Sequence, residues 1–239
     1  MGAGFPSGAG GANNKCGRSR VWGHAAKKMT YSVKEIYYTL QGEGAQTGRA
    51  AVFLRFAGCN LWIVLEKDRA QATCQFCDTD FVGTDGPNGG KFPDAASLAR
   101  AVRAQWPDHV HGKPYVVCTG GEPLLQLDGA AIAAFKAQGF EIGIETNGTL
   151  LPPAGIDWIC VSPKADAEQK LKRGDELKLV YPQDKARPEQ FAGQNFTHFF
   201  LQPMDNQDRS ANTQAATAYC LAHPQWRLSL QTHKLLGIP

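Results

Sequence analysis

The segment at residues 59–80 reads CNLWIVLEKDRAQATCQFCDTD and holds three of the seven cysteines of the chain. Cys59 follows a predicted strand, and Cys74 and Cys77 follow it 15 and 18 positions later as a C-x-x-C pair. Three thiols are one too few for a structural zinc site, which takes four ligands, and an odd number leaves one thiol over in any set of disulfides. The segment therefore needs a different explanation.

Four interpretations of these thiols are open on the spacing alone. A zinc site would recruit a fourth ligand such as Cys118, Cys160 or His198, and a redox C-x-x-C pair at the start of a helix would not need Cys59. Three unrelated cysteines would behave as small buried hydrophobes, but the polar setting ATCQFCDTD at residues 72–80 is unlike a core. An iron–sulfur cluster takes thiolate ligands, and four irons held by three thiolates leave one iron open for a second molecule. This last interpretation accounts for an odd number of thiols.

The bulk composition is that of an ordinary globular protein. The chain has 239 residues, 43% hydrophobic and 20% charged, enough for one domain with a sizeable core. A net charge of +3 does not supply the strongly basic face that nucleic-acid binding requires, and no apolar run is long enough to span a bilayer. We therefore expect neither nucleic acid nor a membrane as a direct partner.

Residues 1–28 differ in composition from the rest of the chain. They are rich in Gly, Ala and Asn, end in two lysines and lack the apolar core of a signal peptide. We predict that they are a disordered extension or a non-native start, with Met29 as an alternative start, and that residues 29–239 form a single domain. Without an export signal the expected compartment is the cytoplasm, where thiols stay reduced.

Short β-branched or aromatic runs alternate with helical segments after residue 29. Candidate strands lie at residues 51–56, 115–119, 141–145, 158–162, 176–180, 199–203 and 227–231. Candidate helices, the first capped by Asp94 and the second by Gly139, lie at residues 94–105, 128–138 and 212–222. This alternation predicts an α/β fold with about six mostly parallel strands and three helices, too few for an eight-fold barrel. Residues 82–93 and 182–193 are expected to be loops.

A second motif follows the strand predicted at residues 115–119. The chain continues as Gly120-Gly121-Glu122-Pro123, in which two glycines allow the backbone to approach a ligand closely and the carboxylate accepts from an ammonium or amide. A plain turn from a strand to a helix is the alternative. The motif becomes specific in combination with the three cysteines upstream.

With these two motifs the chain resembles the radical S-adenosylmethionine (SAM) enzymes. Phe76 between the paired cysteines matches the cluster loop of that family, and the turn at residues 120–123 matches its methionine-binding motif. One departure is the spacing of the first two cysteines, which are separated by fourteen residues here and by three in most of the family. The resemblance implies a truncated partial barrel with an enlarged cluster loop and with the site at the carboxyl ends of the strands.

The segments IYYTLQGEG at residues 36–44, FLRFAGCNL at 53–61 and CDTD at 77–80 narrow this resemblance. They are similar to the 7-carboxy-7-deazaguanine synthase family, which contracts a pterin ring on the route to queuosine, and the similarity covers about residues 30–239. The alternative is an activating enzyme of glycyl-radical proteins, which also uses a cluster with SAM, but no signature of that group is recognised in the sequence. A non-enzymatic zinc module, which would be colourless, has no need of Arg55 or of the Gly-Gly-Glu-Pro turn.

The resemblance implies a radical SAM lyase reaction. Cys59, Cys74 and Cys77 would hold one [4Fe–4S] cluster, whose open iron chelates the amino and carboxylate groups of SAM. Cleavage of SAM would yield a 5′-deoxyadenosyl radical that takes a hydrogen atom from C6 of 6-carboxy-5,6,7,8-tetrahydropterin. Ring contraction and loss of ammonia would then give 7-carboxy-7-deazaguanine. Mg²⁺ is also expected, bridging the substrate to the hydroxyl of Thr79, because magnesium is commonly held by few protein groups together with substrate oxygens.

Two further sets of residues are implied by the resemblance. SAM would be bound by Phe76, Cys77, Asp78, Gly121, Glu122, Ser162, Pro163, Lys164, Gln202, Pro203, Met204 and Asp205. Several of these follow predicted strands, and ligands of open α/β sheets bind at such carboxyl ends. A solvated lysine is the alternative for Lys164, and core packing is the alternative for Met204.

The substrate would be bound by Leu40, Gln41, Gly42, Glu43, Arg55, Thr119 and Pro239. The guanidinium of Arg55 is a natural bidentate partner for the substrate carboxylate, although a strand arginine is often simply ion-paired. The amide of Gln41, the bare backbone of Gly42 and the carboxylate of Glu43 could form hydrogen bonds with the donors and acceptors at the edge of a pterin ring. A polar turn is the alternative. The terminal carboxylate of Pro239 would reach the substrate, with a frayed tail as the alternative.

The remaining cysteines and histidine are assigned no role in the site. Cys118, Cys160 and Cys220 are expected in the core, Cys16 lies in the N-terminal extension, and His233 is expected at the surface. The resemblance further implies a homodimer and a separate electron donor, such as flavodoxin.

Overall fold

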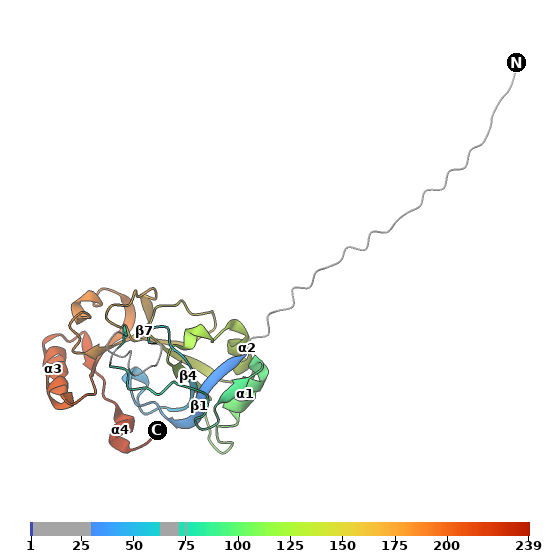
Figure 1. Ribbon diagram of the computed structural model, residues 1–239, viewed down its shortest axis with the longest axis horizontal. Coiled ribbons are helices and arrows are strands. Elements are labelled where there is room, and N and C mark those ends of the chain that lie inside the picture. Colours follow the sequence, from blue (N-terminus) through green and yellow to red (C-terminus); the bar gives the residue numbers. More distant parts are fainter. Residues whose placement is uncertain (2–29, 63–71, 75) are drawn as a thin grey trace.

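The computed structural model describes residue 1 and residues 30–62, 72–74 and 76–239. Apart from Met1, the extension predicted at residues 1–28 lies outside these residues, as does the central part of the enlarged loop at residues 63–71. The described chain is organised around one sheet with the strand order β3-β1-β2-β4-β5-β6-β7-β8-β9 (Figure 1). No helix among the described residues is both long and apolar enough to cross a membrane.

The sheet is parallel over most of its width. Strands β2, β4, β5, β6, β7, β8 and β9 pair in parallel, and they span Ala50–Phe56, Tyr115–Gly120, Glu141–Thr146, Trp158–Val161, Arg173–Tyr181, Asn195–Pro203 and Trp226–Leu228. All seven correspond to predicted strands. The last is shorter than predicted, because residues 229–231 leave the sheet and turn toward the cavity described below.

Two antiparallel strands at the sheet edge were not predicted. Strand β1, Tyr31–Leu40, pairs with β2, and β3, Gly90–Phe92, pairs with the start of β1. The described sheet therefore has nine strands, and the prediction of about six was too low. The charged residues of β1 obscure its period, and β3 is only three residues long within a segment rich in glycine that has the pattern of a loop.

The helices lie where the periodicity placed them, with one addition. Helices α1, α2 and α3 span Ala95–Arg103, Gly129–Ala137 and Arg209–Ala222, and the short α4 spans Thr232–Leu236. The carboxylate of Asp94 accepts from the N–H of Ser97 at 2.8 Å, which confirms the predicted N-cap. Gly139 follows α2 with a φ of +83°, the left-handed conformation that favours glycine at a helix end. The unpredicted α4 makes four helices rather than three.

Apolar packing covers one face of the sheet. On this face, one side chain from each of four neighbouring strands is fully buried against side chains of α1 and α2. These residues are Ile36, Leu54, Val116 and Ile142. A second apolar cluster joins β7 and β8 to α3 on the other half of the sheet. Figure 1 shows α1 and α2 together at one end of the sheet and α3 at the other. The opposite, inner face carries the polar residues of the site.

Strand register brings these polar residues together. Glu35 of β1 pairs with Arg55 of β2, which in turn pairs with Thr119 of β4. Since side chains alternate between the two faces of a strand, all three lie on the inner face, opposite Leu54 and Cys118. The sheet thus places a large apolar cluster on its outer face, whereas its inner face carries these polar residues next to a small apolar cluster of Ala51, Phe53, Tyr115 and Val117.

Candidate active site

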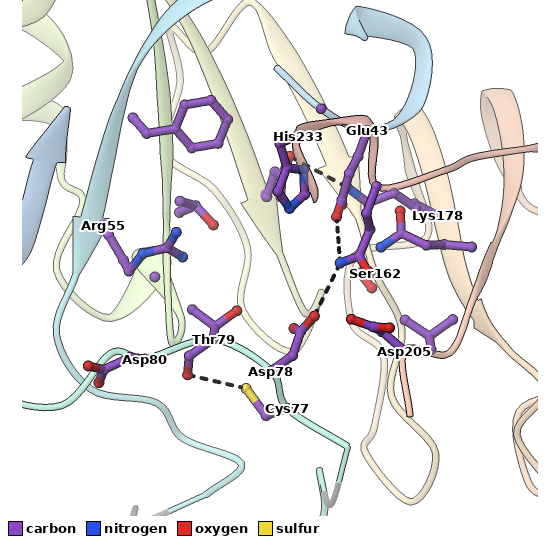
Figure 2. A pocket seen from close by; sticks show the side chains of 18 of the residues that line it. Glu43, Arg55, Cys77, Asp78, Thr79, Asp80, Ser162, Lys178, Asp205 and His233 are labelled. Carbon is purple, nitrogen blue, oxygen red and sulfur yellow. Dashed lines mark hydrogen bonds and ion pairs between the residues drawn. The ribbon is translucent and has the colours of Figure 1, made fainter. Parts of the chain in front are cut away.

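A cavity of about 330 Å³ lies at the carboxyl ends of the parallel strands, a size in the range of small-molecule sites. Figure 2 shows Arg55 on one side of the cavity and Glu43 and His233 on the other, with residues 77–79 along one end. The wall combines residues from seven strands or their ends with the C-terminal segment that follows β9.

Most residues predicted for the site converge on this cavity. Those in its wall are Leu40, Gln41, Gly42, Glu43, Arg55, Cys74, Phe76, Cys77, Asp78, Thr79, Thr119, Gly121, Ser162, Lys164, Gln202, Pro203, Met204, Asp205 and Pro239. Cys59, Glu122 and Pro163 are not part of the wall. Cys59 packs closely against Gly121, which is part of the wall. A Cβ added to Gly121 would lie only 2.8 Å from the Cβ of Cys59 and 2.2 Å from the oxygen of Gly58.

The thiols lie at one end of the cavity. A hydrogen bond between Cys74 and Cys77 lowers the pKa of Cys77 to about 6 and raises the pKa of Cys74. The Sγ of Cys59 accepts from the N–H of Leu61 at 3.4 Å, and burial raises its pKa. A thiol with a lowered pKa is largely thiolate at neutral pH, which is the form that binds iron.

The three thiols have the chemistry that an iron–sulfur cluster requires, because Cys thiolates are its usual ligands. Within residues 30–62, 72–74 and 76–239, no three His, Cys, Asp or Glu side chains are grouped so that they could hold one metal ion. Cys118 and Cys160 are buried in β4 and β6 and do not line the cavity, so neither supplies the fourth ligand of a zinc site there.

Glu122 has a different position from the one expected of a ligand-binding carboxylate. Its side chain is fully buried and accepts from the hydroxyl of Thr146 and the N–H of Asn147, each at 2.8 Å, and from the N–H of Leu124 at 3.0 Å. Burial raises its pKa, and these hydrogen bonds oppose that effect. The carboxylate therefore ties the Gly-Gly turn to the end of β5, and only the backbone of the turn faces the cavity at Gly121.

Arg55 is ion-paired, as the alternative interpretation predicted, and it also lines the cavity. Its Nε donates to Glu35 at 2.7 Å and its Nη2 donates to the hydroxyl of Tyr37 at 2.9 Å, so the residue is ion-paired within the sheet. The ring of Tyr37 stacks on Phe53 with centroids 5.6 Å apart, which fixes the hydroxyl. Because its Nη1 makes no hydrogen bond among the described residues and the side chain lines the cavity, the guanidinium can still bind an anion.

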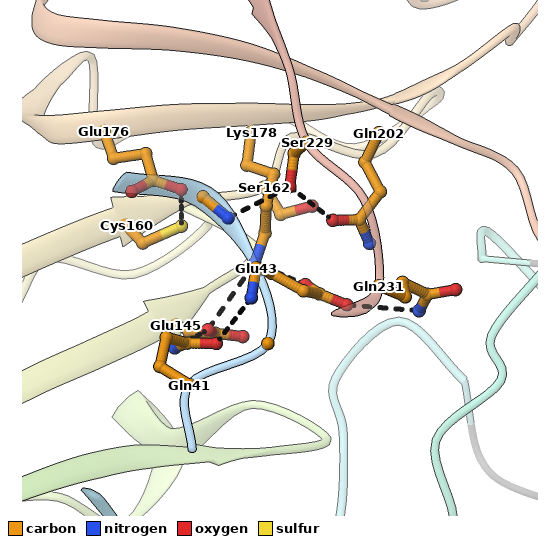
Figure 3. Close-up of polar contacts among 12 residues, drawn as sticks. Gln41, Glu43, Glu145, Cys160, Ser162, Glu176, Lys178, Gln202, Ser229 and Gln231 are labelled. Carbon is orange, nitrogen blue, oxygen red and sulfur yellow. Dashed lines mark hydrogen bonds and ion pairs between the residues drawn. The ribbon is translucent and has the colours of Figure 1, made fainter. Parts of the chain in front are cut away.

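A wall of paired polar side chains lies across the cavity from Arg55 (Figure 2), and Figure 3 shows its contacts. Gln41 donates to Glu145 at 2.9 Å, and the ammonium of Lys178 donates to Glu43 at 2.6 Å and lies 3.5 Å from Glu145. Burial favours the neutral form of Glu43, but Lys178 outweighs burial and lowers the pKa of this carboxyl. Gln231 adds a hydrogen bond to Glu43 at 3.1 Å.

The predicted SAM side of the cavity is also held by polar contacts. Lys164 donates to the Oγ of Ser162 at 2.6 Å and lies 5.9 Å above the ring of Phe76. Lys234 donates to Asp78 at 2.8 Å and to Asp205 at 2.5 Å, so it connects the cluster segment to the end of β8. These contacts position side chains from three separate parts of the chain around one space.

Several wall residues were not predicted. They include Tyr37, Glu145, Lys178, Gln231, His233 and Lys234. His233, which was left out of the site, lines the cavity, and a Cβ added to Gly42 would lie 2.2 Å from its Nδ1. Charged residues within apolar strands, such as Lys178 in LKLV, were the available signal for some of them.

The last residues of the chain pack against the start of the sheet. The hydroxyl of Thr39 donates to the backbone oxygen of Pro239 at 3.0 Å, and Pro239 lines the cavity beside Leu40. Helix α4 is joined to the same region, because the N–H of Thr232 donates to the oxygen of Gly42 at 2.9 Å. The C-terminal segment is therefore part of the cavity wall rather than a frayed tail.

Comparison with known proteins identifies this arrangement. No family model matches the chain. A relative from Caulobacter vibrioides named 7-carboxy-7-deazaguanine synthase is 68% identical over 211 residues, covering 88% of this chain and 100% of the relative. The chain belongs to the 7-carboxy-7-deazaguanine synthase family. A relative of the same name from Bordetella pertussis is also 68% identical over 211 residues, covering the same shares of the two chains.

A solved structure agrees with this family assignment. The crystal structure of QueE from Escherichia coli matches with a TM-score of 0.64 and 26% identity, covering 84% of this chain and 94% of that one. The predicted family and α/β partial-barrel fold are confirmed. As a member of the synthase family, the chain is a radical SAM lyase with a [4Fe–4S] cluster and SAM as cofactors.

Proposed function

We propose that the cavity binds 6-carboxy-5,6,7,8-tetrahydropterin beside SAM and that the chain converts this pterin to 7-carboxy-7-deazaguanine with loss of ammonia. When bound, the cluster and SAM supply the abstraction of a hydrogen atom from C6 of the substrate. The observation that carries the assignment is the placement of Arg55 and the paired polar wall on opposite sides of one cavity whose end holds the cysteines. The chain's own residues bind, orient and enclose the reactants.

The carboxylate of the substrate is assigned to Arg55. Glu35 and Tyr37 orient the guanidinium, and its Nη1 is available for an ionic hydrogen bond to the substrate. Thr79 lies in the same wall, and its hydroxyl is the proposed protein ligand of Mg²⁺, which would bridge to the substrate. Pro239 and Leu40 line the adjoining part of the cavity and enclose the substrate there.

The ring edge of the substrate is assigned to the paired polar wall. A pterin presents N–H donors and a carbonyl, which match the carboxylates of Glu43 and Glu145 and the amide of Gln41. His233 lies against Gly42 in the same wall, where a larger residue than glycine would displace it. Thr119, the residue before the last of β4, lies between this wall and Arg55.

SAM is assigned to the remaining side of the cavity. The backbone at Gly121 would receive its methionine end, with Glu122 acting from behind as the anchor of that turn. Phe76, Ser162 and Lys164 lie together beside the cluster segment. Gln202, Pro203, Met204 and Asp205 at the end of β8 would hold the nucleoside portion, and Asp78 would approach it from the cluster segment.

We further propose a cellular setting consistent with this chemistry. Residues 29–239 would act as one catalytic domain in the cytoplasm, where thiols stay reduced. The chain would function as a homodimer and would receive its electron from a separate donor such as flavodoxin. These assignments rest on the family resemblance.

An anaerobic assay tests the proposed function. The protein is reconstituted with iron and sulfide and incubated with SAM, Mg²⁺, reductant and 6-carboxytetrahydropterin, and 7-carboxy-7-deazaguanine is sought by mass spectrometry. We expect product with the native chain and none with Cys77→Ala, because two thiolates do not retain the cluster. Cys220→Ser removes a thiol outside the cavity and should retain both iron and product.

Two results would contradict the proposal in different ways. A brown protein that cleaves SAM and leaves the pterin intact would retain the radical chemistry and exclude this substrate. Product formation by Cys77→Ala at the native rate would exclude the assigned cluster ligand.

A further inference from the structure

Lys178 is buried among carboxylates that outnumber it. Its side chain is 5% exposed, and it lies in β7 between Glu43, which follows β1, and Glu145, at the end of β5. Glu176, two residues earlier on the same face of β7, is also buried. In the described part of the chain, Lys178 is the one cation within 4.0 Å of Glu43 or Glu145.

Glu176 is bound in a different way. It accepts from the N–H of Ala45 at 3.0 Å and contacts the Sγ of Cys160 at 3.5 Å. Burial raises its pKa. Among the described residues, Glu43 and Glu145 are therefore the two carboxylates that lie within 4.0 Å of the Lys178 ammonium, and their oxygens face the cavity as acceptors of hydrogen bonds.

Lys178, Glu43 and Glu145 line the main cavity, so in the proposed complex the substrate lies against them in place of solvent. A second cavity beside Glu43, Glu145 and Glu176 measures about 10 Å³, room for about one water molecule. With the substrate bound and the counter-charge removed, the anionic form of Glu43 is disfavoured, since burial disfavours the charged form. A protonated Glu43 would present an O–H donor to the N–H donors of the substrate.

We infer that Lys178 is a positioning residue whose ammonium keeps Glu43 and Glu145 as oriented anions, so that the cavity accepts hydrogen bonds from the N–H groups of the pterin ring. This inference rests on the proposed function and adds to it a determinant of substrate specificity. Lys178 acts through the two carboxylates, and its removal affects binding of the pterin more than the chemical step.

The charged and titratable groups facing Glu43 come from several elements. In addition to Lys178, they are Glu145 on β5, Cys160 on β6, Glu176 on β7, His233 on α4 and, through the shared amide of Gln231, Asp78 of the cluster segment. A titration seen in a variant must therefore be assigned to Glu43 directly. Carbon-13 labelling of glutamate carboxyls separates it from Cys160, His233 and Asp78.

The first measurement is the pH profile of KM in the reconstituted holoenzyme at saturating SAM. For Lys178→Met we expect the KM for 6-carboxytetrahydropterin to rise about 100-fold at pH 7, as is typical when one partner of a buried charge pair is removed. The increase should shrink as the pH rises to 9, because a carboxyl freed of its cation ionises on the alkaline side. The kcat should change less than about threefold.

Two variants control for folding and for loss of a positive charge elsewhere. Lys178→Arg retains the cation and should restore a KM within about tenfold of the native value with a flat pH profile. Lys185→Met removes an exposed lysine paired with Asp166 and should leave KM unchanged. Thermal unfolding of each variant identifies any that does not fold.

An equal rise of KM at every pH would overturn the inference, since it would indicate a direct contact between Lys178 and the substrate. An unchanged KM, or a loss confined to kcat, would also overturn it. The carbon-13 titration needs no substrate, and the Glu43 carboxyl, assigned by the loss of its signal in Glu43→Gln, should titrate at higher pH in Lys178→Met than in the native chain. If the native enzyme leaves the pterin intact, the proposed function fails, and this titration still decides whether Lys178 sets the ionisation of Glu43.

Discussion

The two faces of the sheet carry different kinds of side chain, even where the residues are neighbours in the chain. Leu54 and Arg55 are consecutive residues of β2, yet Leu54 is fully buried beneath α1 and α2, whereas Arg55 points inward to an ion pair and the cavity. The same contrast holds between Cys118 and Thr119 in β4. One strand therefore supplies the core with one residue and the site with the next.

This difference shows how a partial barrel can hold a core on one face of its sheet and a binding cavity on the other. Strands of parallel sheets are commonly apolar on both sides because helices cover both faces. Here the apolar cluster formed with α1 and α2 covers one face of β2, β4 and β5, and the inner face pairs its charges with one another around a cavity. Stability and reactant binding are thus assigned to opposite faces, and substitutions can separate them.

The largest effect is expected from the outer face. Leu54→Ala should lower the free energy of unfolding by about 2–5 kcal/mol, because it removes a buried side chain and leaves a cavity under the helices. Chemical denaturation of the folded holoenzyme measures this change. The KM for the pterin should stay within about twofold of the native value, and a large rise in KM would mean that the two faces are coupled.

The inner face should respond in the opposite way. Arg55→Met should raise the KM for the pterin about 100-fold, because the substrate carboxylate loses its ionic hydrogen bond. Its free energy of unfolding should fall by less than that of Leu54→Ala, since the lost ion pair with Glu35 is partly exposed. Steady-state kinetics and denaturation on the same preparations provide the test, and an unchanged KM would remove Arg55 from the substrate site.

The smallest effect is expected at a helix end remote from the cavity wall. Asp94→Ala should lower the free energy of unfolding by about 1 kcal/mol, since it removes the N-cap of α1, and should leave the kinetics unchanged. Asp108→Ala is a matched control. The Asp108 carboxylate is fully exposed, and its removal costs only one ion pair with Arg103, at 3.5 Å. Equal losses of stability in the two variants would argue against the cap.

Local patterns were sufficient for most of the fold. The seven parallel strands and three longer helices follow from apolar runs, and Asp94 and Gly139 mark helix ends because their preferences act within a few residues. Strand β1 was missed because Lys34 and Glu35 interrupt its apolar pattern, and both are explained by partners elsewhere in the fold. The short α4 has no buried residue to give it a periodicity.

The sequence alone determined the chemistry that the chain carries: three cysteines at an uneven spacing, a Gly-Gly-Glu-Pro turn after a strand, and an arginine next to an apolar residue of the core. These features are local, and the physical preferences behind them act over short distances. Only the tertiary structure decided that Glu122 is an anchor, that His233 lies against Gly42 and that Lys178 pairs with Glu43 across 135 positions of the chain. Such pairs are set by strand order and register, because buried charges must find partners among whichever side chains the assembled sheet places beside them.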